Sequence, residues 1–390
     1  MYLTREEERI LDGECGWANQ TCMKILVRLG ELFNGRRLIP ISTAHVSGIS
    51  YKTLGDAPIE FLRALADANG KVKVKTTLNP QGLDPEYLAK RLPNNLCQKQ
   101  LDILEQFERM GSTPSLTCTP YHLEKPDRGS HLAWAESSAV VYANSVLGAW
   151  TNREGGPSAL AAAIVGKTPD YGMHRAANRQ PSILVNIEAE LQNETDFGAL
   201  GIHLGKLLRD KVPAIQGLQK TSKDSLKQLS AAIATTGMAN MFHCGTCPRE
   251  KKMEEITVED KDVRRAIDEL STAPSKKPDL VFIGCPHCSV DEMKQVAKLA
   301  RGKKVKPRTE FWICTSNYVK EAARDCVKEI EKSGGHVLAG VCTVVSWTEK
   351  LGIQTIMTNS AKTAYYAPNL SKAETILSPM KECLKAALQG

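Results

Sequence analysis

Twelve cysteines occur in this chain of 390 residues, and three of them follow hydrophobic, strand-like runs. Cys118, Cys285 and Cys342 each stand at or near the end of such a run, where the chain is expected to turn. Thiolates presented in this way are good metal ligands and could together hold a metal cluster. The three lie too far apart in the sequence to form a local metal-binding loop, so the fold would have to bring them together.

The N-terminal residues argue against export. The segment Met1–Arg9 is charged and lacks the apolar core and small-residue cleavage site of a secretory signal. We therefore expect a cytoplasmic protein, in which disulfides are rare. Metal ligation, catalysis or burial must then account for the cysteines.

Two Cys-x-x-Cys pairs offer different chemistry: Cys244 with Cys247, and Cys285 with Cys288. Together they match the spacing of a four-thiolate zinc site. The second pair also precedes an expected helix, where the pKa of the first thiol is lowered, as in redox-active dithiols. A redox role would leave the other two strand-end cysteines unexplained. A non-catalytic zinc or redox module is the alternative of a different class. His287, inside the second pair, could ligate a metal or bond a sulfur, but a solvent-facing turn position is expected.

The composition predicts a globular protein of two or three domains. The chain is 42% hydrophobic and long enough to bury more than one core. It has no run of about eighteen uncharged apolar residues, so no membrane span is expected. The net charge of +7 fits an anionic small-molecule substrate and equally a mildly basic surface. Basic stretches such as 302–308 are short and lack aromatic residues, so no nucleic-acid partner is expected.

The C-terminal part shows the clearest alternation of strands and helices. The predicted elements are strand 279–284, helix 290–301, strand 310–315, helix 318–332 and strand 337–345. Continuous apolar strands alternating with helices indicate a parallel sheet covered on both faces. Ser289 and Glu292 form a capping-box pattern at the first helix. Cys285, Cys314 and Cys342 then fall near the carboxyl ends of three strands, where open α/β sheets bind ligands.

The N-terminal half is also predicted to be mixed α/β. The expected strands are 37–42, 72–78 and 115–119, and the expected helices are 6–11, 19–33, 58–68 and 97–110. Small-residue turns at 44–50 and 76–80 expose hydroxyl, amide and backbone N–H groups that suit an oxyanion, although ordinary turns use the same residues. The approximate subdivisions are an N-terminal α/β region 1–125, a helical and mixed middle region 126–275, and a C-terminal βαβαβ region 276–390.

The middle region begins with a helix and a constrained turn. Polar groups crowd both ends of the segment 136–164, and a second helix is expected near Pro157, since proline suits the first helical position. The turn between them presents Arg153 and Glu154. These two side chains could contact a ligand or brace the loop, because bidentate arginine contacts serve both purposes.

Several strings, in order along the whole chain, resemble the aconitase X family. The signature strings are AESSAVVYANSVLGA at 135–149 and TNREGGPSA at 151–159. Agreement continues in HVSGISY at 45–51, TLNP at 77–80, LTCTPY at 116–121, GCPHCS at 284–289, TNSAK at 358–362 and YAP at 366–368. The resemblance implies a multi-domain, aconitase-like α/β architecture with parallel βαβ sheets. The swivelling domain of ordinary aconitases would be a separate small subunit.

The resemblance implies an iron–sulfur hydro-lyase. Archaeal two-subunit members of the family dehydrate (R)-5-phosphomevalonate to trans-anhydromevalonate 5-phosphate in a mevalonate pathway to isoprenoids. Cys118, Cys285 and Cys342 match the cluster ligands of a [4Fe–4S] centre with one open iron, which acts as a Lewis acid on the leaving hydroxyl. The base would be a serine of the small subunit, so this chain alone would be incomplete. Within the family, cis-3-hydroxy-L-proline dehydratase is the alternative activity.

The resemblance also assigns substrate contacts by position. The matching residues are Gly48, Ile49, Ser50, Asn79, Pro80, Asn144, Ser145 and Lys362. Arg153 and Glu154 are expected nearby. Two departures from the family pattern, Trp150 in place of an arginine and Ala361 in place of a glycine, could reshape the pocket and bear on the substrate more than on the reaction type.

Overall fold

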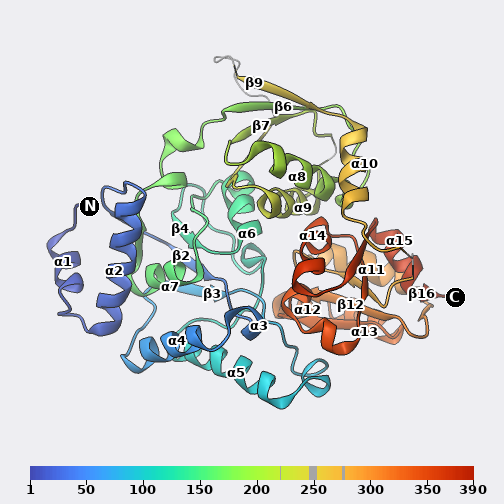
Figure 1. Ribbon diagram of the computed structural model, residues 1–390, viewed down its shortest axis with the longest axis horizontal. Coiled ribbons are helices and arrows are strands. Elements are labelled where there is room, and N and C mark those ends of the chain that lie inside the picture. The colour runs from blue at the N-terminus through green and yellow to red at the C-terminus, as the bar shows by residue number, and fades with distance from the viewer. Residues whose placement is uncertain (220, 246–252, 275–276) are drawn as a thin grey trace.

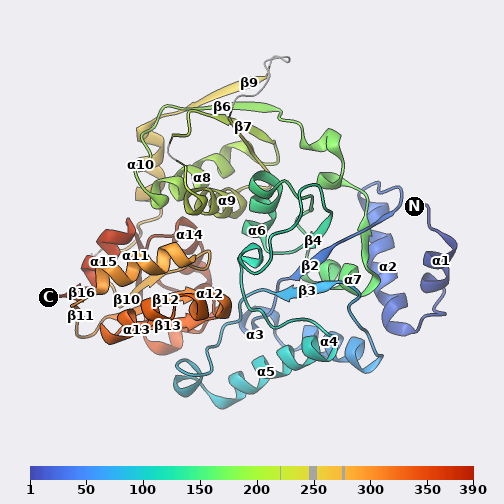
Figure 2. The ribbon, with the colours of Figure 1, turned by 180° about the vertical axis from the view of Figure 1, so that it is seen from behind.

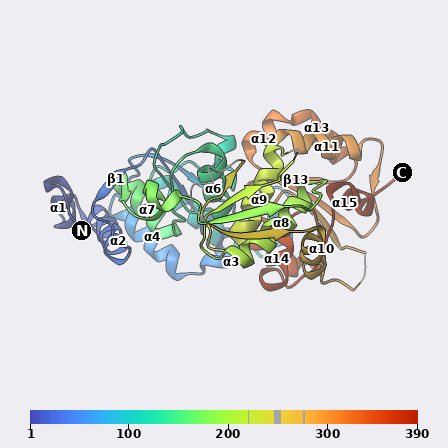
Figure 3. The same cartoon turned by 90° about the horizontal axis from the view of Figure 1, so that it is seen from above.

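The computed structural model describes residues 1–219, 221–245, 253–274 and 277–390. Three successive segments of the chain each build a parallel sheet with helices packed on it, and the three units form separate lobes around a common centre (Figure 1). The N-terminus and the C-terminus lie at opposite ends of the long axis (Figure 3). No helix among the described residues is long and apolar enough to cross a membrane.

The first segment is organised around a three-stranded parallel sheet with the order β3-β2-β4. Helix α7 packs on β2, and α2 packs on α7. A two-stranded antiparallel sheet pairs β1 with β5, and η3 is a π-helical turn. The elements are α1 Arg5–Leu11, α2 Trp17–Leu32, β1 Leu38–Pro40, β2 Thr43–Val46, α3 Tyr51–Leu54, α4 Ala57–Asp67, β3 Lys75–Leu78, η1 Ala89–Arg91, α5 Asn94–Arg109, η2 Pro120–His122, β4 Leu132–Trp134, α6 Ser137–Tyr142, η3 Ala143–Leu147, α7 Gly156–Val165, β5 Lys167–Pro169 and η4 Gly172–His174.

The second segment forms a four-stranded parallel sheet with the order β8-β7-β6-β9. Its two long helices, α8 and α9, pack against each other. They also contact α6 of the first segment and α14 of the third, so this helix pair connects all three units. The elements are η5 Ala176–Arg179, β6 Ile183–Ile187, α8 Glu194–Leu208, β7 Pro213–Gln216, α9 Lys223–Thr236, β8 His243–Cys244, β9 Glu254–Val258 and α10 Asp260–Glu269.

The third segment forms a five-stranded parallel sheet with the order β13-β12-β10-β14-β15, seen from behind in Figure 2. A small antiparallel pair, β11 with β16, lies beside it. The elements are β10 Leu280–Ile283, α11 Val290–Ala300, β11 Lys304–Val305, β12 Glu310–Thr315, α12 Asn317–Ala322, α13 Arg324–Lys332, β13 His336–Ala339, η6 Thr343–Val345, η7 Thr348–Leu351, β14 Thr355–Thr358, α14 Ala361–Leu370, β15 Glu374–Leu377, α15 Met380–Ala387 and β16 Leu388–Gln389.

The strands of the third sheet are apolar throughout because both faces are covered. Val281 and Ile283 point to the core formed with α11, α13 and α15. Leu280 and Phe282 point to a second core that includes Leu88 of the first segment and residues of α14. The first and third segments therefore share a core, which fixes one against the other.

Most predicted strands are present, with three differences. The predicted strand at 115–119 is irregular chain between Pro114 and Pro120, since proline cannot donate to a strand ladder. Strand β2, at the centre of the first sheet, was expected to be part of a turn. The predicted strand 337–345 ends at Ala339, because Gly340 adopts a positive φ of 75°.

The boundaries of the helices agree closely with the prediction. Helix α11 begins with the predicted capping box of Ser289 and Glu292. The predicted helix 318–332 is two helices, α12 and α13, that meet at Ala323. The subdivision at residues 125 and 275 stays a prediction, since sheet membership alone does not delimit domains.

Candidate functional site

A cavity of about 250 Å³ lies where the first and third segments meet. Its walls are formed by chain ends that leave parallel strands: the turns after β2 and β3, the start of α6 after β4, and the loops after β10 and β13. The carboxyl ends of parallel strands collect at one edge of a sheet, so two sheets placed edge to edge enclose a pocket there. The predicted positions of Gly48, Ile49, Ser50, Asn79, Pro80 and Lys362 all line it.

Cys118, Cys285 and Cys342 line the same cavity. Cys118 and Cys285 are 8% and 7% exposed, and Cys342 is partly buried. Burial raises the pKa of Cys118 well above its ordinary value. Burial, reinforced by Cys285, raises the pKa of Cys342 to about 12. Thiols in such a place stay protonated unless a cation is bound beside them.

The cysteine donors of this cavity are three thiols. In the part of the chain that the structure describes, no three His, Cys, Asp or Glu side chains are placed to bind one metal ion. Cysteines that ligate an iron–sulfur cluster each bind a different iron, so their sulfur atoms lie further apart than the ligands of one ion. Three thiols line one cavity, with no fourth cysteine lining it among the described residues, and this number of donors fits a cluster with three protein ligands.

A polar wall formed by Lys362, Glu136 and Asn79 lines the same cavity. Lys362, in the first turn of α14, forms an ion pair with Glu136. The amide of Asn79 donates to the second oxygen of Glu136 at 2.9 Å, and the hydroxyl of Ser138 donates to the first at 2.8 Å. The carboxylate of Glu136 is thus fully used in holding other side chains.

The charges of this wall are fixed by their mutual contact. Burial would raise the pKa of Glu136, but the ammonium of Lys362 and the hydrogen bonds outweigh it and lower that pKa to about 2. Burial would lower the pKa of Lys362, but the charge of Glu136 outweighs it and raises that pKa above its ordinary range. Both groups are therefore ionised at neutral pH.

A buried histidine supports the wall from behind. His45, in β2, contacts Asn79 through Nε2 at 3.4 Å and the hydroxyl of Thr77 through Nδ1 at 2.8 Å. Burial lowers the pKa of His45 to about 4, so the ring is neutral. This ring orients the amide of Asn79, which in turn orients Glu136.

The loop that carries Cys285 is held by helix α9 of the second segment. Lys227 donates to the carbonyl of His287 at 3.3 Å, and Gln228 donates to the carbonyl of Cys285 at 3.3 Å. Both side chains are buried, with 1% and 2% of their surface exposed. The second segment thereby positions a cavity residue through a neighbouring loop.

Lys227 is also the centre of a buried charge cluster. Its ammonium pairs with Asp224 at 3.1 Å and with Glu292. The hydroxyl of Ser289 donates to Asp224 at 2.9 Å, which ties the cluster to the end of the same loop. Removing one member of a buried ion pair leaves an uncompensated charge, so this cluster resists distortion of the loop.

His287 is not in the solvent-facing position expected from its turn. It is 1% exposed, and burial lowers its pKa to about 4. The prediction was wrong because the turn between β10 and α11, which contains His287, is covered by α9 and by the first segment.

Two predicted substrate contacts lie away from the cavity. The amide of Asn144 donates to the carbonyls of Thr151 and Asn240, both at 2.9 Å. The hydroxyl of Ser145 accepts from the backbone N–H of Phe242 at 2.9 Å. Both side chains join the first segment to the second. Their role in substrate binding stays a prediction.

Arg153 and Glu154 differ in what they contact. Glu154 accepts from the hydroxyls of Ser158 and Thr168, so it braces its own turn. Arg153 reaches only the carbonyl of Gly237, through Nη1 at 3.4 Å. Its Nε and Nη2 are buried and have no hydrogen-bond partner among the described residues. An arginine in this condition retains capacity for an anion.

Several cavity residues were not among the predicted site residues, and Glu136 and Ser137 are two of them. Glu136 and Ser137 line the pocket at the point where β4 gives way to α6. Glu136 is also the N-cap of α6, since its side chain accepts from the backbone N–H of Ser138. The signal was present in an acidic residue that follows the apolar run 132–135 and precedes a helix.

Comparison of the chain with models of known protein families shows which family it belongs to. Residues 1–177 match the aconitase X first domain, residues 181–268 the second domain and residues 278–389 the third domain. The chain belongs to the aconitase X family. The resemblance read from the sequence strings is confirmed, and so is the predicted mixed α/β architecture with parallel sheets.

Individual relatives of this aconitase X chain agree. It is 43% identical to the phosphomevalonate dehydratase large subunit of Methanocaldococcus jannaschii, with 99% of this chain and 100% of that protein covered. The crystal structure of Thermococcus kodakaraensis aconitase X in its holo-form matches with a TM-score of 0.92 and 42% identity, covering 99% of this chain and 100% of that one. The cis-3-hydroxy-L-proline dehydratase of Pseudomonas aeruginosa is 32% identical over 98% of this chain, which covers 69% of that protein.

The two departures from the aconitase X pattern lie outside the cavity wall. The ring of Trp150 is stacked beneath the guanidinium of Arg179, whose carbon is 4.5 Å from the ring centroid. Ala361 is fully buried, and its Cβ faces Gly198 of α8. Neither residue is among those that line the pocket.

The two Cys-x-x-Cys pairs of this aconitase X chain belong to different units. Cys244 is in β8 of the second sheet and is exposed, and Cys247 lies outside the described residues. Cys288 is fully buried in the core with Met293, whereas Cys285 lines the cavity. The zinc module therefore stays an untested alternative.

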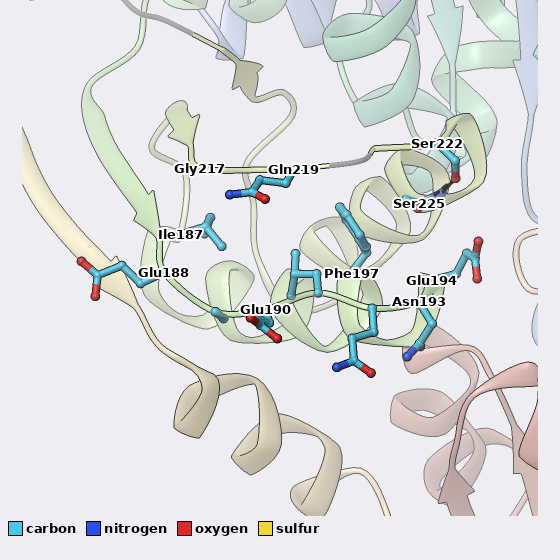
Figure 4. A pocket seen from close by; sticks show the side chains of 13 residues that line it. Ile187, Glu188, Glu190, Asn193, Glu194, Phe197, Gly217, Gln219, Ser222 and Ser225 are labelled. Atoms are coloured by element: carbon cyan, nitrogen blue, oxygen red, sulfur yellow. Dashed lines mark hydrogen bonds between the residues drawn. The ribbon is translucent and has the colours of Figure 1, made fainter.

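A larger cavity of the aconitase X fold, about 660 Å³, lies elsewhere, at the carboxyl ends of β6 and β7. Figure 4 shows side chains reaching it from the loop after β6, the start of α8 and the start of α9. Three of them, Glu188, Glu190 and Glu194, are carboxylates. Size alone would favour this pocket, but it contains none of the cysteines.

Proposed function

We propose that this chain is the large subunit of a dehydratase that converts (R)-5-phosphomevalonate to trans-anhydromevalonate 5-phosphate. The observation that carries the proposal is the convergence of Cys118, Cys285 and Cys342 on one cavity that also contains Lys362. Five archaeal relatives named phosphomevalonate dehydratase large subunit, 38–44% identical over nearly the whole chain, support the substrate.

The same three cysteines would hold an iron–sulfur cluster. When bound, a cluster with one open iron supplies a Lewis acid for the departing tertiary hydroxyl. Its cationic irons also favour the thiolate forms that burial otherwise opposes. A [4Fe–4S] centre with one open iron is the proposed cofactor.

The polar side chains would bind and orient the substrate. Lys362 supplies an ammonium at the cavity, and the turn that contains Gly48, Ile49 and Ser50 supplies backbone groups and a hydroxyl. Gly48 has a φ of 77°, a conformation open to glycine that lets the turn approach a ligand closely. Arg153 would add a second cation through its unpartnered nitrogens, as a dianionic phosphate requires.

The base that removes the substrate proton is proposed to come from a small subunit. Glu136 is a poor base, because Lys362 and its hydrogen bonds lower its pKa to about 2 and occupy both oxygens. His45 is neutral but has both ring nitrogens engaged. A serine on a swivelling small subunit would complete the site, in a cytoplasmic heterodimer.

The alternative substrate is cis-3-hydroxy-L-proline. Its dehydratases resemble this chain at 31–32% identity, less than the archaeal relatives do. Hydroxyproline carries one carboxylate and no phosphate. The ammonium of Lys362 in the cavity, together with the unpartnered nitrogens of Arg153, which is not itself a lining residue, therefore favours the phosphorylated substrate.

The test is dehydration by the reconstituted pair. This chain and its small subunit are purified without oxygen and given each substrate, and alkene formation is followed. We expect turnover of phosphomevalonate, and about 1,000-fold less with Cys118→Ala, since loss of Lewis-acid stabilisation costs several kcal/mol. Cys383→Ala, in α15, is the matched control.

Two results would contradict the proposal. Turnover of hydroxyproline but not of phosphomevalonate would show that cis-3-hydroxy-L-proline is the substrate. A colourless preparation with stoichiometric zinc, lost in Cys244→Ala and retained in Cys118→Ala, would favour the zinc module.

A further inference from the structure

The side chain of His287 contacts the segments of the other two cysteines. Its ring Nε2 lies 2.9 Å from the carbonyl of Val341, the residue before Cys342. Its Nδ1 lies 3.3 Å from the hydroxyl of Thr117, the residue before Cys118. A carbonyl can only accept, so Nε2 carries the proton and Nδ1 accepts from the threonine.

The backbone of His287 makes a third connection. Its N–H donates to the sulfur of Cys118 at 3.2 Å. Hydrogen bonds to a sulfur ligand stabilise the thiolate and tune the centre that it binds. The residue itself lies in the loop of Cys285, so one amino acid touches all three cysteine segments.

The loop that contains Cys285 and His287 is held in place by hydrogen bonds from the second segment. Helix α9 holds the carbonyls of Cys285 and His287 through Gln228 and Lys227, each at 3.3 Å. The ring is 1% exposed and both of its nitrogens are engaged. It therefore cannot ligate a metal without breaking a buried hydrogen bond, which would leave a carbonyl or a hydroxyl unsatisfied.

We propose that His287 is a positioning residue that sets the spacing of the three thiols, and that retention of the cluster depends on its side chain. The inference rests on the proposed function for the identity of the bound group. The arrangement of the thiols does not depend on the proposed function, because the hydrogen bonds of His287 are made by the protein alone.

Three variants separate positioning from general stability. His287→Leu removes both ring contacts, and His287→Gln restores a donor toward Val341. His174→Leu is the matched control: His174 is also buried, at 4% exposure, and contacts His131 away from the cysteines. Thermal unfolding of each variant gives the general loss of stability.

The first measurement uses the anaerobically loaded chain. Iron and sulfide per chain, and the half-time of iron loss to a chelator, are measured for each variant. We expect His287→Leu to lose iron about 10- to 100-fold faster than the wild type, as for other residues that orient metal ligands. His287→Gln should recover part of this, and His174→Leu should match the wild type. Equal half-times for His287→Leu and His174→Leu would overturn the inference.

The second measurement uses the metal-free chain, so that it does not depend on the proposed function. Alkylation rates of individual cysteines are followed by mass spectrometry under native conditions. His287→Leu should raise the rates at Cys118 and Cys342 at least several-fold and leave Cys22 and Cys383, buried elsewhere, unchanged. A wild type that binds no iron would refute the cluster, while unchanged alkylation rates would refute the positioning role.

Discussion

The two cavities of this molecule both lie at the carboxyl ends of parallel strands, yet they differ in almost every other respect. The larger one, about 660 Å³, is bordered by exposed carboxylates from one segment. The smaller one, about 250 Å³, is built from two segments, and its polar groups are buried and paired with one another. Three thiols face it.

The difference shows what marks a reactive site in this fold. The N-termini of α8 and α9 at the larger cavity favour anions, whereas the glutamates that line it repel them. These two effects oppose each other, so the charges of this cavity favour neither anions nor cations. In the smaller cavity, Lys362 and Asn79 are held in place by Glu136, which is itself held by Ser138. Groups whose positions are fixed before a ligand arrives bind and stabilise charge at low cost.

The strongest way to break this comparison is to remove the ammonium from the smaller cavity. Lys362→Met leaves Glu136 buried without its partner, so we expect the free energy of unfolding to fall by about 3–5 kcal/mol. Dehydration should fall to background. Glu190→Gln in the larger cavity is the control and should change unfolding by less than about 0.5 kcal/mol. Denaturant titration measures both, and a Glu190→Gln effect as large as that of Lys362→Met would reverse our ranking of the cavities.

A pH series sharpens the comparison. The pKa of Glu136 is lowered from 4.5 to about 2, so its contribution to stability is present above pH 4.5 and is lost as the pH falls toward 2. The shift corresponds to roughly 3 kcal/mol. The stability difference between the wild type and Glu136→Gln should therefore be constant from pH 6 to 8 and shrink below about pH 4.5. A difference that is unchanged down to pH 3 would show that the pair is not ionised in the folded chain.

The smallest expected effect concerns the cation beside the pocket. Arg153→Gln removes a charge-assisted contact worth about 1.5–3 kcal/mol. The KM for phosphomevalonate should rise about 10- to 100-fold with little change in kcat, and Arg153→Lys should recover part of it. Steady-state kinetics of the reconstituted pair measure this. An unchanged KM would mean that the unpartnered nitrogens of Arg153 face no substrate group.

Much of the fold could be predicted from the sequence because local signals agree with it. Strand β12 has the predicted bounds, and α11 begins at its predicted cap, since apolar runs and a capping box are both short-range patterns. Strand β2 was missed because Thr43 and His45 make it look polar. The position of His45 is explained by its contacts with Thr77 on the neighbouring strand β3 and with Asn79 just after it, which no local pattern reveals.

Candidate residues from the sequence include the three cysteines, Asn79 and Lys362, and the structure places all of them on one cavity. Turns after apolar strands marked Cys285 and Asn79, whereas the strand predicted around Cys118 is irregular chain. The contribution of Lys227 and the burial of His287 could not be predicted in this way. Both follow from the packing of α9 against a loop of another segment, and such long-range contacts leave no periodicity in either stretch.

The division of the cysteines between segments has a consequence for how the enzyme is made. During synthesis Cys118 leaves the ribosome long before Cys342 does. A growing chain thus offers isolated thiols that bind iron weakly. In the proposed enzyme, iron can be loaded only after the C-terminal sheet has formed. Chains that end before Cys342 would therefore lack one cluster ligand and would not hold the cofactor.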